Sequence, residues 1–202
     1  MARQRPLNLV FGASGYIGTH LVPRLLAEGV AVRVTSRHPE VLAARGWLQV
    51  EIIQADALEP KSLKKALEGV QIAYYLVHSM IAQEEKFVEA DRRAAHNMVK
   101  ASATAGLERI IYLGGLAEAK QAALSKHLKS RIEVAEILQS GPVPTTDLRA
   151  PMILGSGSAS FEILRYLVEH LPAMITPRWV QSLNQPIAIR NVIGNLVGCL
   201  SH

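Results

Sequence analysis

The stretch Gly12-Ala13-Ser14-Gly15-Tyr16-Ile17-Gly18 decides the fold of this chain, because it joins an apolar run at 7–11 directly to a helical pattern. A glycine just after a strand permits a sharp turn, a middle glycine lets backbone approach an anion, and a last glycine lets the helix pack closely on the strand. The start of the helix then presents N–H groups to a pyrophosphate. The stretch therefore predicts a phosphate-binding loop, and the alternative is a glycine-rich turn that holds no ligand.

Short apolar runs alternate with longer helical patterns along the chain, as in a parallel sheet whose strands are buried on both faces. The predicted strands are 7–11, 31–35, 50–54, 72–77, 109–113 and 145–149. Five glycines follow the helical patterns and predict left-handed helix ends: Gly29, Gly46, Gly69, Gly106 and Gly141. Pro23 falls inside the first helix, where we expect a kink and no break. The alternation predicts an α/β fold, a doubly wound parallel sheet (Rossmann fold) with helices on both faces.

The alternation stops after residue 149, where Pro151, Gly155, Gly157 and three later prolines divide the chain into short pieces. One helix is expected near 160–171. We therefore expect a nucleotide-binding domain at 1–150 and a small C-terminal cap region on the substrate side at 151–202. A helical pattern begins near residue 193 shortly before the sequence ends, so we expect this segment to be truncated relative to longer relatives.

Composition excludes several classes of protein. The 202 residues are 49% hydrophobic and 19% charged, with a formal net charge of +5, which is not typical of a disordered chain. The basic residues are scattered and aromatic residues make up only 5%, so we expect no nucleic-acid partner. Cys199 is the single cysteine, which excludes a disulfide framework and a multi-cysteine zinc site. No run approaches the ~20 apolar residues of a membrane helix, and we expect a cytoplasmic protein with no bound metal.

The loop and three later landmarks resemble the short-chain dehydrogenase/reductase superfamily, in its extended and atypical branches, and most of all its NAD(P)H-binding, NmrA-like proteins. The landmarks are Asp56 after the third strand, the run 74–79 (Tyr-Tyr-Leu-Val-His-Ser) and the run 148–151 (Leu-Arg-Ala-Pro). The resemblance covers roughly residues 7 to 192. It implies that the loop residues Gly12, Ala13, Ser14, Gly15, Tyr16, Ile17 and Gly18 hold a nicotinamide dinucleotide.

The end of the second strand favours NADP(H) over NAD(H). An NAD-specific fold places a carboxylate there for the ribose 2′-hydroxyl, whereas this strand ends in Ser36-Arg37-His38. The guanidinium of Arg37 pairs well with a 2′-phosphate, with Ser36 and His38 as further donors. The less favoured alternative is that Arg37 is a solvated loop residue. The resemblance assigns Asp56 and Ala57 to the adenine edge, and an Asp after a strand is also a common helix N-cap.

The resemblance implies a nicotinamide pocket at the ends of the fourth and sixth strands, and the chain departs from it in the catalytic residues. The pocket residues would be Val77, His78, Pro151 and Met152. Family enzymes use a Tyr-x-x-x-Lys pair, but the nearest alignment here places His127 and Arg131 at those positions. Ser79, beside His78, is a second catalytic candidate, and His127 and Arg131 could also be a solvated helix face.

Two functions from different classes follow. The first is an NADP-dependent oxidoreductase acting on an unidentified small molecule, and we lean toward it because the superfamily consists mostly of enzymes. The second is a non-catalytic module that senses NADP(H) or engages a protein partner, which the missing Tyr-Lys pair favours. Formation of a homodimer is a further open alternative.

Overall fold

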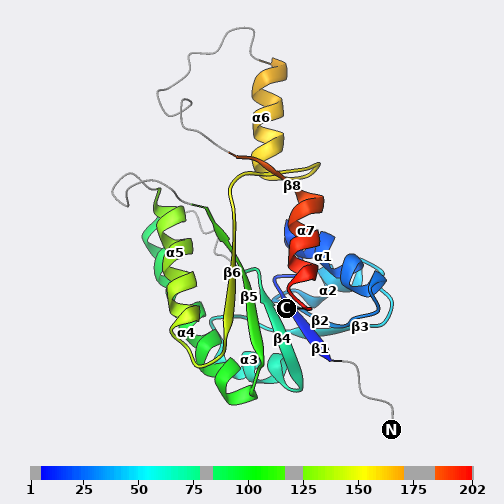
Figure 1. Cartoon of the computed structure of the whole chain (residues 1–202), viewed down its shortest axis with the longest axis vertical. Helices are drawn as coiled ribbons and strands as arrows, with labels where there is room; N and C mark the ends of the chain where they lie inside the picture. Colours follow the sequence, from blue (N-terminus) through cyan, green and yellow to red (C-terminus); the bar gives the residue numbers. More distant parts are fainter. Residues whose placement is uncertain (1–5, 78–83, 117–124, 171–184, 202) are drawn as a thin grey trace.

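The computed structural model describes residues 6–77, 84–116, 125–170 and 185–201, apart from the side chains of 84–86 and 159–160. Within these residues a six-stranded, fully parallel sheet has the order β3-β2-β1-β4-β5-β6 (Figure 1). The strands are β1 (Leu7–Phe11), β2 (Ala31–Ser36), β3 (Val50–Gln54), β4 (Val70–Tyr75), β5 (Arg109–Gly115) and β6 (Thr145–Ala150). All six predicted strands are confirmed. The strand order reverses between β1 and β4, and such a switch point is where ligands bind in open α/β sheets.

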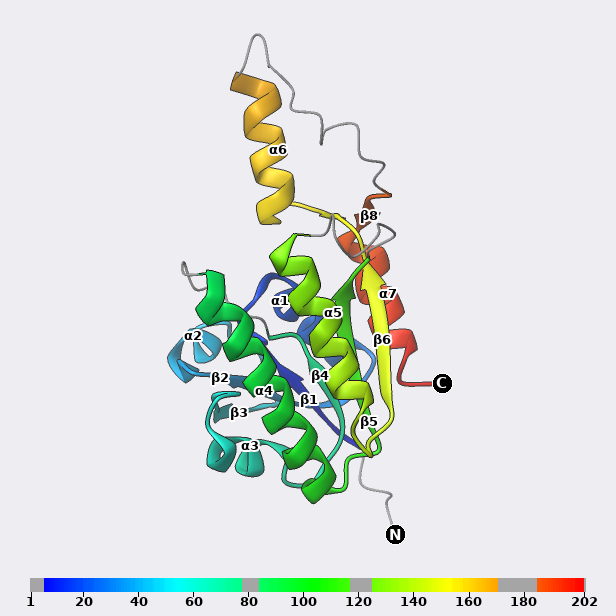
Figure 2. The same cartoon turned by 90° about the vertical axis from the view of Figure 1, so that its left-hand side faces the viewer.

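Helices cover both faces of the sheet, as predicted (Figure 2). They are α1 (Tyr16–Ala27), α2 (Pro39–Ala43), α3 (Pro60–Leu67), α4 (Glu84–Ala105), α5 (Lys126–Gln139), α6 (Ala159–His170) and α7 (Ile189–Gly198). One hydrophobic core joins the sheet to α3, α4 and α5, and a second joins it to α1, α2 and α7. Helix α1 runs without a break across Pro23.

The segment expected as one cap region divides into two parts. The short strand β7 (Ile153–Leu154) leaves the end of β6 and pairs with β8 (Ile187–Ala188), while α6 projects away from the sheet (Figure 1). Helix α7 returns to the sheet, where Val192, Ile193 and Leu196 are buried in the core with α1. The buried Tyr74 hydroxyl donates to the Leu196 carbonyl at 3.0 Å. Helix α7 therefore packs into the same core as α1 and one face of the sheet.

Four of the five predicted glycine helix ends are confirmed. Gly29, Gly46, Gly69 and Gly106 have φ of 71°, 64°, 71° and 70°, the left-handed region that favours glycine. The prediction for Gly141 is wrong, because this residue is not among those with positive φ. A Cβ at Gly141 would instead lie 2.7 Å from Cγ1 of Val99, so close packing of α4 explains this glycine.

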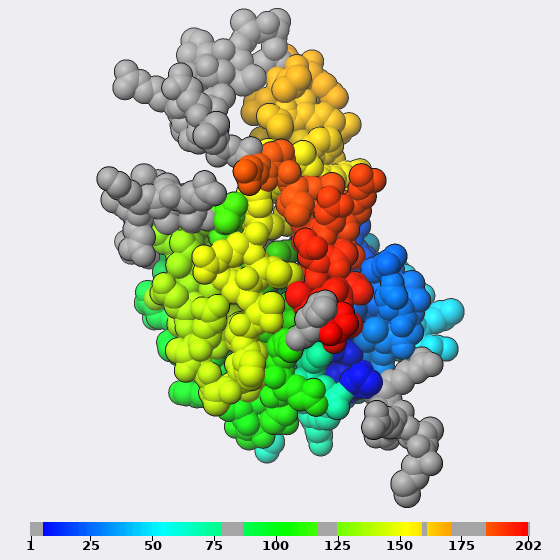
Figure 3. Space-filling view, in the orientation of Figure 1, coloured from blue at the N-terminus to red at the C-terminus, as the bar shows by residue number. Residues whose placement is uncertain are grey.

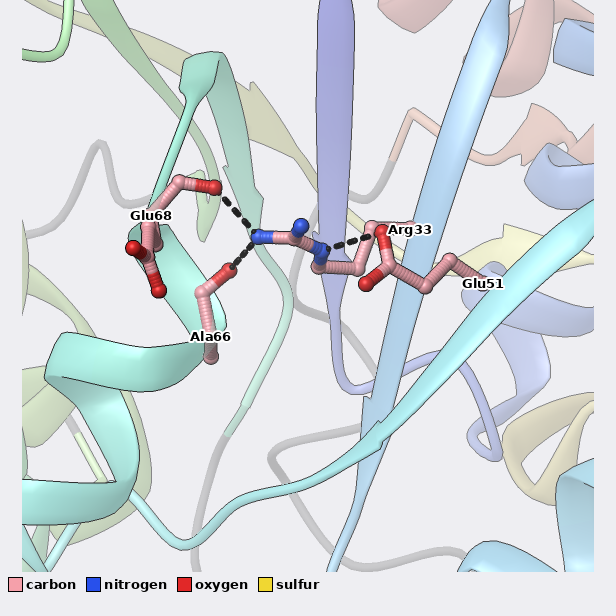
Figure 4. Close-up of polar contacts among 4 residues, drawn as sticks. All are labelled: Arg33, Glu51, Ala66 and Glu68. Atoms are coloured by element: carbon pink, nitrogen blue, oxygen red, sulfur yellow. Dashed lines mark hydrogen bonds and ion pairs between the residues drawn. The ribbon is translucent and has the colours of Figure 1, made fainter.

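Arg33 is a buried cation in the middle of β2 that sequence reasoning missed (Figure 4). Its guanidinium donates to the carbonyl oxygens of Ala66 at 2.8 Å and Glu68 at 2.6 Å, and to the Glu51 carboxylate at 2.8 Å. The two carbonyls lie at the end of α3, where a helix leaves acceptors without intrahelical partners and attracts positive charge. Arg33 thus joins α3 to the sheet and has a structural role.

Two kinds of feature are absent from the described residues. None of their helices is long and apolar enough to cross a membrane. Among the same residues, no group of three or more His, Cys, Asp or Glu side chains is placed to hold a metal ion.

Candidate functional site

The loop between β1 and α1 is shaped by two close backbone approaches. Gly12 has φ of 98°, and a Cβ there would lie 3.0 Å from the backbone of Leu76 at the end of β4. A Cβ at Gly18 would lie 2.5 Å from Cα of Ala13 and 2.6 Å from the Gly12 carbonyl oxygen. Backbone atoms cannot move aside as a flexible side chain can, so both positions require glycine. These two contacts are the sharp turn and the tight helix–strand packing that the spacing predicts.

The start of α1 is exposed at Gly15, and its first turn carries no acidic residue of its own. Gly15 is the N-cap residue, no side chain caps the helix, and its first turn contains no acidic residue. The amides of Tyr16, Ile17 and Gly18 begin the helix and so lack intrahelical acceptors. A Cβ at the exposed Gly15 would meet only the Gly12 carbonyl oxygen, at 3.4 Å. The loop therefore forms a backbone cradle that fits the diphosphate of a dinucleotide.

The end of β2 presents a cation without a partner. Arg37 is exposed, and its guanidinium has no hydrogen bond or ion pair with any residue that the structure describes. Its carbonyl accepts from Nε2 of Gln54 at 3.0 Å, so the backbone of this turn is tied to β3. The Ser36 hydroxyl accepts from the His38 amide at 3.0 Å, and the exposed His38 ring lies 3.2 Å from the Glu40 carboxylate. Arg37 is thus the group at this turn that is free to meet a phosphate.

Asp56, after β3, belongs to a tight turn and does not cap α3. Its Oδ1 accepts from the Leu58 amide at 2.9 Å, and the N-cap residue of α3 is Glu59. The helix-capping alternative for Asp56 is therefore wrong, because the chain makes a further turn before the helix begins. Ala57 is buried beside it, and its carbonyl accepts from Asn97 of α4 at 3.0 Å. The assignment of the Asp56 carboxylate to the adenine edge stays a prediction.

The two proposed walls of the nicotinamide pocket are described only in part. Val77 is half-buried and lies against Gly12, since a Cβ at Gly12 would be 3.3 Å from its amide nitrogen. His78 and Ser79 lie outside the described residues. Pro151 and Met152 are half-buried at the end of β6, and the Met152 carbonyl accepts from the Ile187 amide at 3.0 Å. Pro151 and Met152 therefore lie where the chain passes from the sheet to the segment that carries α6.

His127 and Arg131 lie one turn apart on the same face of α5, and their side chains have different neighbours. The exposed His127 ring stacks on the buried ring of Phe87 in α4, with ring centres 4.3 Å apart and an angle of 5° between planes. Arg131 instead lies at the end of β5, where a Cβ on Gly115 would be 3.5 Å from its Cδ. Three residues along from His127, the Ser130 hydroxyl donates to the buried Asp91 of α4 at 3.1 Å. From this shared face His127 and Ser130 contact α4, whereas Arg131 reaches the end of β5.

The sequence analysis did not identify Tyr112 and Asp147, which form a polar cluster beside Arg131. Tyr112 of β5 is buried, and its hydroxyl donates to the Arg131 carbonyl at 3.2 Å. Burial raises the pKa of Tyr112 to about 12, although the nearby Arg131 guanidinium opposes this shift. The side chain of Asp147 pairs with Arg149 at 2.7 Å and leaves Oδ1 buried without a partner among the described residues. Only strand pairing, which sets Tyr112 opposite Asp147, could have revealed this cluster.

Strand β5 ends in Gly114 and Gly115, where family enzymes place a serine or threonine. A Cβ at Gly114 would lie 2.8 Å from Oδ1 of Asp147, and one at Gly115 would lie 2.5 Å from a methyl carbon of Leu128. A hydroxyl-bearing residue at either position would therefore require one of these side chains to move.

Together, the switch point, the backbone cradle and the open helix start define a Rossmann-type dinucleotide-binding domain. The family model described as NAD(P)H-binding matches residues 12–142, more than half of the chain. The chain therefore belongs to this NAD(P)H-binding family and is an atypical protein of the short-chain dehydrogenase/reductase type.

Individual proteins agree with this assignment. The ceramide reductase of Caulobacter vibrioides is 26% identical over 171 residues, which cover 84% of this chain and 53% of that protein. The chain thus spans about half the length of this curated relative. The structure of MoeE5 in complex with UDP-glucose and NAD matches 94% of this chain and 70% of its own, with 19% identity and a TM-score of 0.75. The Citrobacter sp. triphenylmethane reductase complexed with NADP(H) matches 80% and 54%, with 23% identity and a TM-score of 0.65. These two structures support the fold.

Proposed function

We propose that this chain binds NADP(H) and acts as a reductase on an apolar small molecule. The observation that carries the proposal is the cradle at Gly12–Gly18, whose open amides and missing side chains fit a diphosphate. Membership of an NAD(P)H-binding, reductase-like family supports the same conclusion. When bound, the cofactor would supply a hydride, and this chain would bind it, orient it and shape the space beside it.

The preference for NADP(H) over NAD(H) is argued from Arg37. The similar solved structures include both an NAD complex and an NADP(H) complex, so fold similarity does not distinguish the cofactors. Arg37 is exposed, carries an unpaired guanidinium among the described residues and follows the strand that faces the adenosine ribose in such folds. A guanidinium forms charge-assisted hydrogen bonds with a phosphate, and Ser36 offers a hydroxyl beside it. His38 is assigned a lesser part, because its ring already pairs with Glu40.

An apolar substrate is favoured by the segment that follows β6. Pro151 and Met152 supply non-polar surface there, and α6 exposes further large apolar side chains beyond them. The exposed residues are Ile163, Leu164, Tyr166 and Val168. The similarity to a ceramide reductase, a protein named for a lipid, points in the same direction.

Two roles are proposed for the catalytic candidates: binding of a cofactor oxygen and donation of a proton. We assign Arg131, at the end of β5, to the binding of a ribose or phosphate oxygen, because a guanidinium donates hydrogen bonds but does not exchange protons near neutral pH. The proton donor is assigned to His127, and Ser79 stays a second catalytic candidate near the nicotinamide. The stacking of His127 on Phe87 favours the second candidate function, a cofactor-binding module without turnover, because it directs the ring toward α4.

A turnover assay separates these two functions. NADPH oxidation is followed by absorbance with a panel of apolar aldehydes, ketones and enones for the parent protein, His127→Ala and the control His96→Ala. His96 is an exposed histidine of α4. Turnover that His127→Ala abolishes and His96→Ala retains would support the reductase with His127 as proton donor. NADPH binding without turnover on any compound would favour the sensing module.

A further inference from the structure

The side chain of Tyr16 links the phosphate loop to the segment that carries α6. Tyr16 is the first residue of α1, so its amide belongs to the cradle. Its ring extends toward the turn after β7, where a Cβ on Gly155 would overlap the Tyr16 hydroxyl and would lie 2.7 Å from Cγ2 of Ile189. Gly157 lies beside the same ring, since a Cβ there would be 3.7 Å from Cε2 of Tyr16. The loop, the turn at 155–157 and the start of α7 therefore meet around one aromatic ring.

The same turn holds the base of α6. The Gly157 amide donates to Oε1 of Glu162 at 3.1 Å, and the Ser158 amide donates to the Gly155 carbonyl at 3.0 Å. The Ser158 hydroxyl donates to the Ile153 carbonyl at 2.8 Å, and Ser158 is buried. Burial and the nearby Glu162 carboxylate raise the pKa of Tyr16, which agrees with this packing. The position of α6 is thus set by a short turn that rests on Tyr16.

Little else in the described residues supports α6. The space-filling view shows it standing clear of the body formed by the sheet and its covering helices (Figure 3). The helix has 12 residues, and isolated helices of that length are marginal in water. Its order and direction therefore depend strongly on the contacts at its base.

We propose that Tyr16 is a positioning residue that couples dinucleotide binding at the loop to the seating of α6. A diphosphate held by the Tyr16 amide restricts the backbone of this residue and hence the direction of its ring. The restricted ring in turn supports the turn at 155–157, so α6 becomes more ordered when the cofactor is bound. Because coupling is reciprocal, a substrate that orders α6 would also tighten cofactor binding. This inference rests on the proposed NADP(H) binding.

Packing of the ring, and not a hydrogen bond of the hydroxyl, carries this coupling. The hydroxyl oxygen of Tyr16 is buried beside Gly155 and has no hydrogen-bond partner among the residues that the structure describes. Tyr16→Phe keeps the ring beside Gly157 and removes only the unsatisfied oxygen, whereas Tyr16→Ala removes the contacts with both glycines. Gly155→Ala disturbs the contact from the other side. Gly194→Ala is the matched control, since a Cβ there would have no atom within 4 Å.

Hydrogen–deuterium exchange of α6 tests the coupling, with NADPH affinity measured by calorimetry so that each protein is compared at its own saturation. NADPH is expected to slow amide exchange in α6 by about fivefold or more in the parent, Tyr16→Phe and Gly194→Ala, which is the lower range of allosteric coupling factors. The effect is expected to be lost in Tyr16→Ala and Gly155→Ala. Undiminished protection in both of these variants, or its loss in Tyr16→Phe, would overturn the role of the ring. NADPH binding by the parent without protection of α6 would overturn the coupling alone, whereas no NADPH binding would overturn the proposed function as well.

Discussion

Gly15 and Gly18 belong to the same loop, yet the structure predicts opposite consequences when a side chain is added to each. At Gly15 a Cβ would meet only one oxygen at 3.4 Å, and its φ of −76° suits any residue. At Gly18 a Cβ would lie 2.5 Å from a backbone atom of Ala13. We therefore expect Gly15→Leu to fold and to lose cofactor binding, because the new side chain extends over the open amides. Gly18→Ala is expected to destabilise the fold itself.

The response to NADPH separates the two variants more clearly than their ligand-free melting temperatures do. Replacing an N-cap glycine by a poorer cap costs about 1 kcal/mol or less, or ~2–4 °C in melting temperature for a chain of this size. Overpacking at Gly18 costs about 1–3 kcal/mol, or ~2–12 °C. NADPH at about 100 times its Kd stabilises the parent by ~2.7 kcal/mol, which raises its melting temperature by about 5–11 °C. This increase is the signal that Gly15→Leu should lose.

Thermal unfolding with and without NADPH measures the loss of stability in each variant and the stabilisation of the parent by NADPH. Circular dichroism of the ligand-free variants checks that each is folded. The expected pattern is a nearly unchanged ligand-free melting temperature for Gly15→Leu with no increase on adding NADPH, and a lowered one for Gly18→Ala. The interpretation of the loop would be refuted if Gly15→Leu kept the full increase. It would also be refuted if Gly18→Ala melted like the parent.

Two further predictions concern arginines with contrasting surroundings. Arg37→Ala should raise the Kd of NADPH about 10- to 140-fold while changing that of NADH little, because ~1.5–3 kcal/mol of charged hydrogen bonding is lost. Calorimetry with Arg45→Ala as the exposed control measures this, and an equal loss for both cofactors would exclude a contact between Arg37 and the 2′-phosphate. Arg33→Met should lower stability toward urea by about 1–3 kcal/mol, because it leaves buried carbonyls of α3 without a donor. The control Arg24→Met breaks only an exposed ion pair worth about 0.3–0.5 kcal/mol, and equal urea midpoints for the two variants would contradict the structural role of Arg33.

Several features of this protein could be predicted from the sequence because their signals are local. A buried parallel strand is a short apolar run, and a left-handed helix end requires a residue such as glycine, so the six strands and four of the five glycine ends were recognised. The phosphate loop was recognised for the same reason, since the needs for a sharp turn and for close packing both fall within seven residues. The preference for NADP(H), in contrast, stays a prediction that depends on Arg37.

Other features depend on residues that are distant in sequence, and only the tertiary structure decided them. Gly141 follows α5 without the left-handed conformation, and its Cα packs closely against Val99 on α4. Arg33 finds two of its three acceptors more than thirty residues away, at the end of α3. His127 and Arg131 are one turn apart on the same helix, yet His127 contacts α4 and Arg131 lies at the end of β5. The sequence by itself determined the sheet and the loop, because backbone conformation and strand burial are encoded residue by residue. Which side chains share a site was decided by packing between elements, because that depends on the positions of atoms that no local pattern records.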